Sequence, residues 1–298
     1  MSRDTSGKPR RSKLASLARL VRAPAALTVP GDILAGAAAT GRASGPALLG
    51  RMVSSICLYW AGMALNDYAD RELDAKERPN RPIPSGEISP GEALGVAVGL
   101  TTAGVALALA ADGKRGLATV LPLAGAVWAY DLTLKSSPIS PISMAATRFL
   151  NVLAGASPGR MRQAVPAALL TGLHTATVSL LSKYEVEGAP MAVPGVALTA
   201  TGLVAAGAVL NGATARPADQ ASALVLAGGY AANGIRSQLM AVADPSPRNV
   251  QGAVASGIHG LTLLQAALTA RAGSPGTALG IATAFPVTRQ LGKRTSPT

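Results

Sequence analysis

Charged side chains are scarce in this sequence: Asp, Glu, Lys and Arg make up 14% of its 298 residues, whereas an ordinary soluble domain has about 25%. A soluble globule of this length would have too few charges to cover its surface, so the composition argues against one. Hydrophobic residues reach 49% of the chain, and the mean hydropathy is +0.33. These values predict an integral membrane protein.

Aromatic residues are also few, at 3% of the chain. Tyr and Trp commonly form belts at the two membrane interfaces, so we expect those belts to be sparse here. Alanine and glycine must then form much of the packing surface, which lets helices approach one another closely.

Cysteine occurs once, at Cys57, which excludes a disulfide within the chain. It lies in an apolar stretch, where the ordinary interpretation is a small buried hydrophobic side chain. His174 and His259 each stand alone in apolar surroundings and are interpreted as hydrogen-bonded core residues. The sequence shows no grouping of Ser, His and Asp or of Cys and His that would predict a covalent nucleophile.

Apolar stretches of roughly spanning length recur along most of the chain. We expect an all-α integral membrane bundle of about nine transmembrane helices, with a central cavity that opens to the cytoplasmic side. The expected organisation is a basic arm at 1–22, a transmembrane domain at 23–275 and a tail at 276–298. The nine stretches lie at about 24–41, 46–65, 92–111, 116–130, 141–158, 164–182, 191–210, 220–241 and 250–270.

Basic residues outnumber acidic ones by 27 to 15, which gives a net charge of +12, and many of them lie in the first 22 residues. A basic arm followed at once by apolar segments favours an anchor against anionic membrane lipids over a nucleic-acid partner. We therefore place the N-terminus in the cytoplasm, in a multi-pass protein of the inner cell membrane. With nine spans, the segments 66–90, 131–140, 183–190 and 242–249 then share the cytoplasmic side.

Several acids follow directly on an apolar helix in the segment NDYADRELDAKERPNRPIPSG, which begins at Asn66. On a helix, Asn66, Asp70 and Asp74 fall on one stripe, and Asp67 lies one step around it. Carboxylates at this spacing repel one another unless a cation binds them, and an all-oxygen set suits Mg²⁺. The spacing therefore predicts a magnesium site.

Basic residues come next in the same segment. Lys76, Arg78 and Arg81 are interleaved with a loop stiffened by proline. Guanidinium groups for phosphate beside carboxylates for a metal predict a diphosphate site. The structural alternative is a solvated helix end with local ion pairs.

The pattern N-D-x-x-D-x-x-x-D, followed by R-x-x-R-P-I-x-x-G, resembles the first aspartate-rich motif of the UbiA superfamily of membrane prenyltransferases. This resemblance covers about residues 15–275. It implies a nine-helix bundle in which Asn66, Asp67, Asp70 and Asp74 bind Mg²⁺ and the diphosphate of an isoprenyl donor at the end of the second helix. Asp70 and Asp74 are then the catalytic acids.

The segment WAYDLTLKSSP is similar to a Tyr- and Lys-containing segment after the fourth helix of that family. The resemblance implies that Lys135 acts as a point charge on the diphosphate. It also implies that Tyr130 hydrogen-bonds the diphosphate or shields a carbocation. The alternative for Lys135 is a lysine that extends to the membrane interface.

The second family motif, D-x-x-D-x-E-G-D, is kept only in part. The matching stretch is SKYEVEGA, with Ser182, Glu185 and Ala189 in place of aspartates and with Glu187 retained. The resemblance implies that Glu185 and Glu187 hold a second Mg²⁺, more weakly because the site has less negative charge. The alternative is a short acidic loop with no ligand. This stretch, together with APAALTVPGDILAG near the start and RFLNVLAGAS in the fifth apolar stretch, resembles a divergent branch of the superfamily, encoded beside ebo-type gene clusters.

Arg148 and Asn151 lie about one turn apart inside an apolar stretch, where an unpaired charge costs roughly 2.5–3.5 kcal/mol. We expect them to face the interior of the bundle. They could contact the diphosphate or the acceptor, or they could form a pair between helices. Asp32 could pair with Arg148 or line the cavity.

These features predict an Mg²⁺-dependent prenyltransferase that moves an isoprenyl group from an isoprenyl diphosphate donor to a small-molecule acceptor in the membrane. The expected partners include membrane lipids and exclude nucleic acid. One alternative is a membrane terpene cyclase that acts on the donor alone. Another is a non-catalytic binder or transporter of lipid diphosphates.

Overall fold

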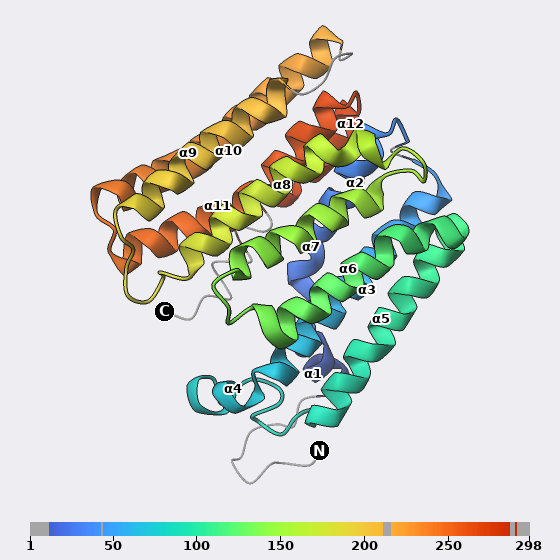
Figure 1. Cartoon of the computed structure of the whole chain (residues 1–298), viewed down its shortest axis with the longest axis vertical. Coiled ribbons are helices and arrows are strands. Elements are labelled where there is room, and N and C mark those ends of the chain that lie inside the picture. The colour runs from blue at the N-terminus through green and yellow to red at the C-terminus, as the bar shows by residue number, and fades with distance from the viewer. Residues whose placement is uncertain (1–11, 43, 211–215, 287–289, 291–298) are drawn as a thin grey trace.

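The computed structural model describes residues 12–42, 44–210, 216–286 and 290, and it contains helices and no β-strand over these residues (Figure 1). The predicted all-α class is therefore confirmed. The elements are α1 (Lys13–Leu20), η1 (Ala23–Thr28), α2 (Val29–Ala39), α3 (Pro46–Ala69), α4 (Arg71–Glu77), α5 (Pro90–Asp112), η2 (Gly113–Gly116), α6 (Leu117–Ala129), η3 (Tyr130–Leu134), α7 (Ser140–Gly155), α8 (Met161–Ser182), α9 (Ala192–Leu210), α10 (Pro217–Ala243), α11 (Pro247–Arg271) and α12 (Pro275–Ala282).

Proline marks the start of α3, α5, α10, α11 and α12. Its fixed φ suits the first helical position, and the N–H that it lacks would have no partner there in any case. At α5 a capping box adds to this effect: Ser89 Oγ accepts from the N–H of Glu92 at 3.2 Å, and the Glu92 carboxylate accepts from the N–H of Ser89 at 2.8 Å. These signals place the helix boundaries close to the ends of the apolar stretches.

Each of the nine predicted apolar stretches coincides with a helix in the described parts of the chain. Five segments there are long and apolar enough to cross a membrane: α3, the continuous segment Pro90–Leu134, α8, α9 and α11. α2 and α7 have 11 and 16 residues, fewer than the roughly 20 that a straight span needs. Nine spanning helices around a central cavity therefore stay a prediction.

The long helices lie side by side in Figure 1, with α5 at one edge and the pair α9 and α10 at the other. α3 packs on α5, α7 on α8, and α10 on α11. The short helix α2 lies among them, in contact with α3, α7, α8 and α11. Its position makes α2 a central packing element although it is too short to span.

One end of the bundle collects α4 and the connections that follow η3, α8 and α10 (Figure 1). Lys183 Nζ donates to the carbonyl of Ser137 at 3.4 Å, and the N–H of Ala189 donates to the carbonyl of Pro245 at 3.0 Å. The four connections predicted to lie on one side of the membrane therefore share one end of the bundle. That this end faces the cytoplasm stays a prediction.

The predicted arm and tail both contribute packed helices. α1 lies in the arm and buries Leu20 in a cluster with α3 and α5. α12 lies in the tail and buries Ala278 and Ile281 against α10 and α11. Residues 1–11 and 291–298 lie outside the described residues.

Two glycines bring α2 and α7 into close contact. A Cβ added at Gly36 would lie 1.9 Å from the carbonyl oxygen of Val152, and one at Gly155 would lie 2.2 Å from that of Ile33. Both distances are far inside van der Waals contact, so only glycine allows the two backbones to pack this way.

We expect Gly155→Ala to force α2 and α7 apart and to destabilise the protein by about 1–3 kcal/mol, the usual cost of overpacking. The measurement is thermal unfolding in detergent. Gly99→Ala on α5 is the matched control, because nothing lies within 4 Å of a Cβ there, and its unfolding temperature should stay the same or rise slightly. Equal unfolding temperatures for both variants would contradict the close packing.

Candidate active site at the loop end of the bundle

The first acidic motif spans the junction of two helices. Asn66 and Asp67 lie in the last turn of α3, and Asp70 separates α3 from α4, which carries Asp74. The continuous helical stripe predicted from spacing is therefore interrupted at Asp70. Asp67 and Asp74 are 3% and 1% exposed, whereas the Asp70 side chain is 27% exposed.

One guanidinium nitrogen lies between the two buried acids. Arg81 Nη1 donates to Asp74 Oδ2 at 2.6 Å and to Asp67 Oδ1 at 3.1 Å. Arg78 Nη1 is 3.8 Å from Asp74 Oδ1, and its side chain is 59% exposed. Charge-assisted bonds such as those of Arg81 offset the cost of burying the two carboxylates. The protein itself thus supplies a cation between Asp67 and Asp74.

The loop that carries Arg81 is anchored by its apolar residues. Ile83 and Ile88 are buried in a cluster with Leu20 of α1 and Leu65 of α3. This burial fixes the loop against the end of α3, so that the guanidinium of Arg81 reaches the acids from the side.

Helix α1 holds the same loop from outside. Arg19 Nη1 donates to both carboxylate oxygens of Glu87 at 2.8 Å, and Ser16 Oγ donates to Glu87 at 2.7 Å. Arg19 Nη2 also donates to the carbonyl of Asn80 at 2.6 Å. The part of the basic arm nearest the bundle is therefore a strap over the first motif.

Arg22 is a functional candidate that the sequence analysis missed, because it counted the residue only as part of the basic arm. Its Nη2 donates to Asp67 Oδ1 at 2.9 Å. Its backbone has φ 47° and ψ 51°, the left-handed region that non-glycine residues seldom adopt. Such strain is kept where the surrounding structure requires it, often at functional sites.

The Tyr130 and Lys135 segment forms η3, a π-helical turn in which the N–H of Lys135 donates to the carbonyl of Tyr130 at 2.9 Å. Such turns are rare and are frequent at functional sites. Lys135 Nζ lies 2.6 Å from Asp70 Oδ1, as an ion pair without hydrogen-bond geometry. The turn therefore brings the lysine to the first motif, while Tyr130 stays half-buried beside it.

Asp131 is the second residue that the sequence analysis missed. It is 4% exposed and accepts from Asn66 Nδ2 at 3.3 Å. An acid next to an apolar stretch, in the quoted segment WAYDL, was the available signal. Asp131 adds a carboxylate to the first motif from a separate element.

The second acidic loop makes fewer contacts with charged residues than the first motif does. Glu185 is half-buried and Glu187 exposed, and neither forms an ion pair with the described residues. Burial raises the pKa of the Glu185 carboxyl above its ordinary value. Within the described ranges, no three His, Cys, Asp or Glu side chains are grouped to hold a metal. A magnesium cluster shared by the two loops stays a prediction.

Arg148 and Asn151 belong to a separate polar network inside the bundle. Asp32 is fully buried and accepts from Arg148 at 2.7 Å, from Asn151 at 2.8 Å and from Gln265 at 2.6 Å. Ser55 donates a short hydrogen bond to Asn151. The predicted pair between helices, with Asp32 as the partner, is confirmed. A contact from Arg148 or Asn151 to substrate stays a prediction.

Two core interpretations are also confirmed. Cys57 is buried. His174 is buried, and its Nδ1 lies 2.9 Å from the hydroxyl oxygen of Tyr230.

The sequence also matches the model of a known protein family. The UbiA prenyltransferase family matches residues 26–287, so the chain belongs to this family. The digeranylgeranylglyceryl phosphate synthase of Methanospirillum hungatei is 43% identical over 101 residues, which cover 30% of this chain and 34% of that protein. The synthase of the same name from Ignicoccus hospitalis is 31% identical over 182 residues, which cover 58% and 59%. The chain thus matches about a third of the first relative's length and less than two thirds of the second's.

Solved structures show the same fold at low sequence identity. One, from a study of digeranylgeranylglyceryl phosphate synthase in membranes, has a TM-score of 0.67 and 18% identity, over 87% of this chain and 98% of that one. A UbiA homologue from Archaeoglobus fulgidus, bound to GPP and Mg²⁺, has a TM-score of 0.58 and 15% identity, over 88% and 99%. The predicted resemblance to the UbiA superfamily is confirmed.

The effects of substituting Arg19 and Glu87, the two charged partners of the strap, on the unfolding temperature should depend on each other. We expect Arg19→Glu and Glu87→Arg each to loosen α1 and to lower the unfolding temperature in detergent, because a partly buried carboxylate loses its charge-assisted bonds. The double variant restores opposite charges and should recover much of the loss. Lys13→Glu is the control, since Lys13 and its partner Glu92 are both about half exposed, and it should leave the unfolding temperature unchanged. Additive losses in the double variant would contradict the strap.

Proposed function

We propose that this protein transfers an isoprenyl group from an isoprenyl diphosphate to an acceptor in the membrane, with Mg²⁺ as cofactor. The observation that carries the proposal is the position of Arg81 Nη1 between Asp67 and Asp74 at the end of α3. In a site where carboxylates and cationic side chains alternate, the carboxylates can bind a metal ion and the cationic side chains can bind phosphate oxygens.

The donor set fits Mg²⁺. Asp67, Asp70 and Asp74 offer carboxylate oxygens, and Asn66 gives its amide nitrogen to Asp131, which leaves its amide oxygen as the available ligand. Each of the three motif acids already has a cation beside it, a guanidinium or an ammonium. The site therefore accepts positive charge at each of these carboxylates, as a hard divalent cation with oxygen ligands requires. Glu185 and Glu187 are the ligands proposed for a second ion.

Binding of the diphosphate would exchange these ion pairs. Arg78, Arg81 and Lys135 would turn from the carboxylates to the phosphate oxygens, while the carboxylates would take the metal. Because charges are exchanged rather than newly buried, the desolvation cost of binding falls. Mg²⁺ in such a site supplies positive charge to the departing diphosphate, which favours breakage of the allylic C–O bond.

The electron and proton balance of the reaction needs no protein nucleophile. The allylic C–O bond breaks, and its electron pair leaves with the diphosphate. An electron pair of the acceptor forms the new bond to the allylic carbon, and the acceptor's proton passes to the released diphosphate. Arg78, Arg81 and Lys135 hold the leaving diphosphate, Tyr130 shields the developing positive charge, and the apolar bundle excludes water.

The donor class follows from chemistry that several similar proteins share. The A. fulgidus homologue was solved with GPP and with DMAPP, each with Mg²⁺, and the curated relatives are named as synthases of a prenylated lipid phosphate. We infer a donor of the isoprenyl diphosphate class and a membrane-soluble acceptor, for which Arg148 and Asn151, both bonded to Asp32, are the proposed contacts inside the bundle. The protein is proposed to lie in the inner membrane with its N-terminus in the cytoplasm.

Asp70→Asn should abolish Mg²⁺-dependent diphosphate release from geranyl diphosphate in the presence of a membrane lipid extract, with a fall of roughly 100-fold or more. Asp70 is the most exposed of the three motif acids, so its variant should fold, and an unchanged unfolding temperature would verify this. Glu72→Gln is the matched control two residues further along the chain, in α4, because the Glu72 side chain is 87% exposed, and it should retain activity.

Product analysis completes this test. A prenylated lipid supports transfer, whereas a hydrocarbon or terpene alcohol made from the donor alone would identify a cyclase. Mg²⁺-dependent binding of several donors without any diphosphate release would identify a non-catalytic binder. Full activity of Asp70→Asn would contradict the proposed metal site.

A further inference from the structure

The end of the bundle opposite the first motif holds a second polar site. The loop after α2 meets the connection between α7 and α8: Ser157 N donates to Thr40 Oγ1 at 3.2 Å, and Arg160 Nη1 donates to the carbonyl of Thr40 at 3.3 Å. A cavity of about 150 Å³ lies where this connection meets η2, and Arg115, Thr119, Pro158 and Gly159 are among the residues that line it. Arg115 and Gly159 are exposed, so the cavity is accessible from the surface.

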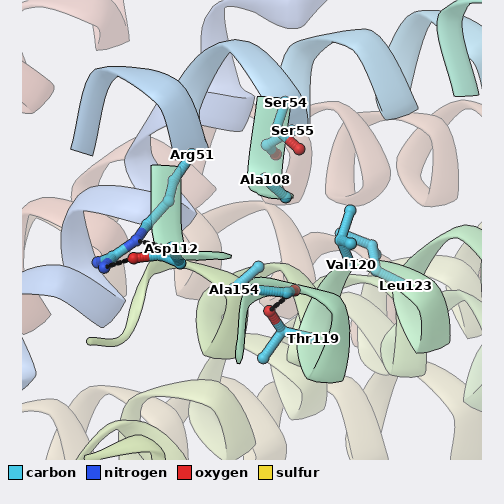
Figure 2. Close-up of a pocket in the computed structure, with 10 residues that line it drawn as sticks. Arg51, Ser54, Ser55, Ala108, Asp112, Thr119, Val120, Leu123 and Ala154 are labelled. Atoms are coloured by element: carbon cyan, nitrogen blue, oxygen red, sulfur yellow. Dashed lines mark hydrogen bonds and ion pairs between the residues drawn. The ribbon is translucent and has the colours of Figure 1, made fainter. Parts of the chain in front are cut away.

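Asp112 is the one acid among the residues that line this cavity, and its charge is cancelled. Arg51 Nε and Nη2 donate to its two carboxylate oxygens at 2.7 and 2.6 Å, and Arg51 Nη1 donates to the carbonyl of Gly155 at 3.0 Å. The two side chains are 8% and 9% exposed. Figure 2 shows this pair at one side of a smaller pocket, which shares Asp112 and Thr119 with the lining of the cavity. The Arg51–Asp112 ion pair has no net charge, so this part of the cavity lining does not repel an anion.

The basic residues near the cavity, unlike Arg51, have no acidic partner among the described residues. Arg115 lines the cavity, and Lys114 precedes it in the chain. Arg42 lies in the connection after α2, and Arg162 lies in the first turn of α8. None of these four forms an ion pair with the described residues. Arg160 donates to a backbone carbonyl, which leaves its positive charge without a counter-ion among the same residues.

We propose that this cavity binds the phosphate headgroup of an anionic phospholipid from the leaflet at this end of the bundle. A guanidinium is well suited to phosphate oxygens. The apolar residues Ala118, Pro158 and Met161 line the same cavity, as expected where a headgroup meets acyl chains. Each basic residue near an anionic membrane surface adds to the attraction. Under the topology proposed above, these cations lie at the non-cytoplasmic end, where the positive-inside tendency disfavours them, and an anionic ligand there would offset their charge.

The site is independent of the proposed enzymatic activity, because it lies at the other end of the helices. Its function would be to hold the junction of α2, α5, α6 and α7 against the membrane surface. The lipid is therefore expected to stabilise the fold and not to take part in the reaction.

The test uses the full chain in detergent and measures its affinity for phosphatidylglycerol, with phosphatidylcholine as the neutral comparison. Wild-type protein should bind phosphatidylglycerol preferentially, and its unfolding temperature should rise by several degrees. The double variant Lys114→Gln/Arg115→Gln should lose affinity by about fivefold for each charge removed. Arg248→Gln, at an exposed arginine of the opposite end, is the control for loss of a positive charge away from the cavity and should bind as wild type does.

A second variant distinguishes binding of the lipid headgroup in the cavity from general electrostatic attraction to the basic residues around it. Ala118 is exposed and lines the cavity, so Ala118→Trp would fill the cavity and leave every charge in place. It should weaken phosphatidylglycerol binding at least as much as the loss of one charge. Unchanged affinity of Ala118→Trp or of the double variant would overturn the proposal. An equal stabilisation by inorganic phosphate would show that the site takes a soluble anion, and it would overturn the assignment to a lipid.

Discussion

The bond from Arg81 to both Asp67 and Asp74 is the interaction on which the loop end of the bundle depends. Two carboxylates buried beside each other would repel, and each would lose its hydration. A single guanidinium nitrogen between them replaces the repulsion by attraction and offsets part of the lost hydration. It also joins the end of α3, helix α4 and the proline-rich loop, which are adjacent in the chain. Burial of Ile83 and Ile88 and the strap formed by α1 then fix this arrangement.

The polar network around Asp32 differs from the loop end in one physical respect. Asp32 accepts hydrogen bonds from three side chains on two other helices, so its charge is fully compensated within the bundle. At the loop end, by contrast, Asp70 and Lys135 stay partly exposed and Arg78 mostly so. Compensated charges at depth hold helices together, whereas partly exposed charges can change partners at low cost. This difference is why the loop end suits a charged ligand.

The sequence alone predicted the features that depend on a local pattern of residues, namely the helices and the grouping of the first motif with Tyr130 and Lys135. The nine apolar stretches match helices, and the first motif, Tyr130 and Lys135 lie at one end of the bundle. It was insufficient for contacts between distant segments. Arg22 reaches Asp67 only because α1 folds back over the loop, and Asp131 reaches Asn66 only because η3 turns beside α3. Helical spacing also predicted that the acids of the first motif lie on one continuous helix, whereas the helix is interrupted at Asp70.

The partial loss of the second motif is easier to understand once Asp131 is included. Ser182 and Ala189 carry no charge, and Glu185 and Glu187 form no ion pair with the described residues. Acids at the first motif come instead from α3, α4 and η3, and Asn66 at the end of α3 contacts Asp131 on η3. A site whose carboxylates already come from three elements depends less on a fourth. The charge balance at the loop end is thus set mainly by the first motif and its basic partners.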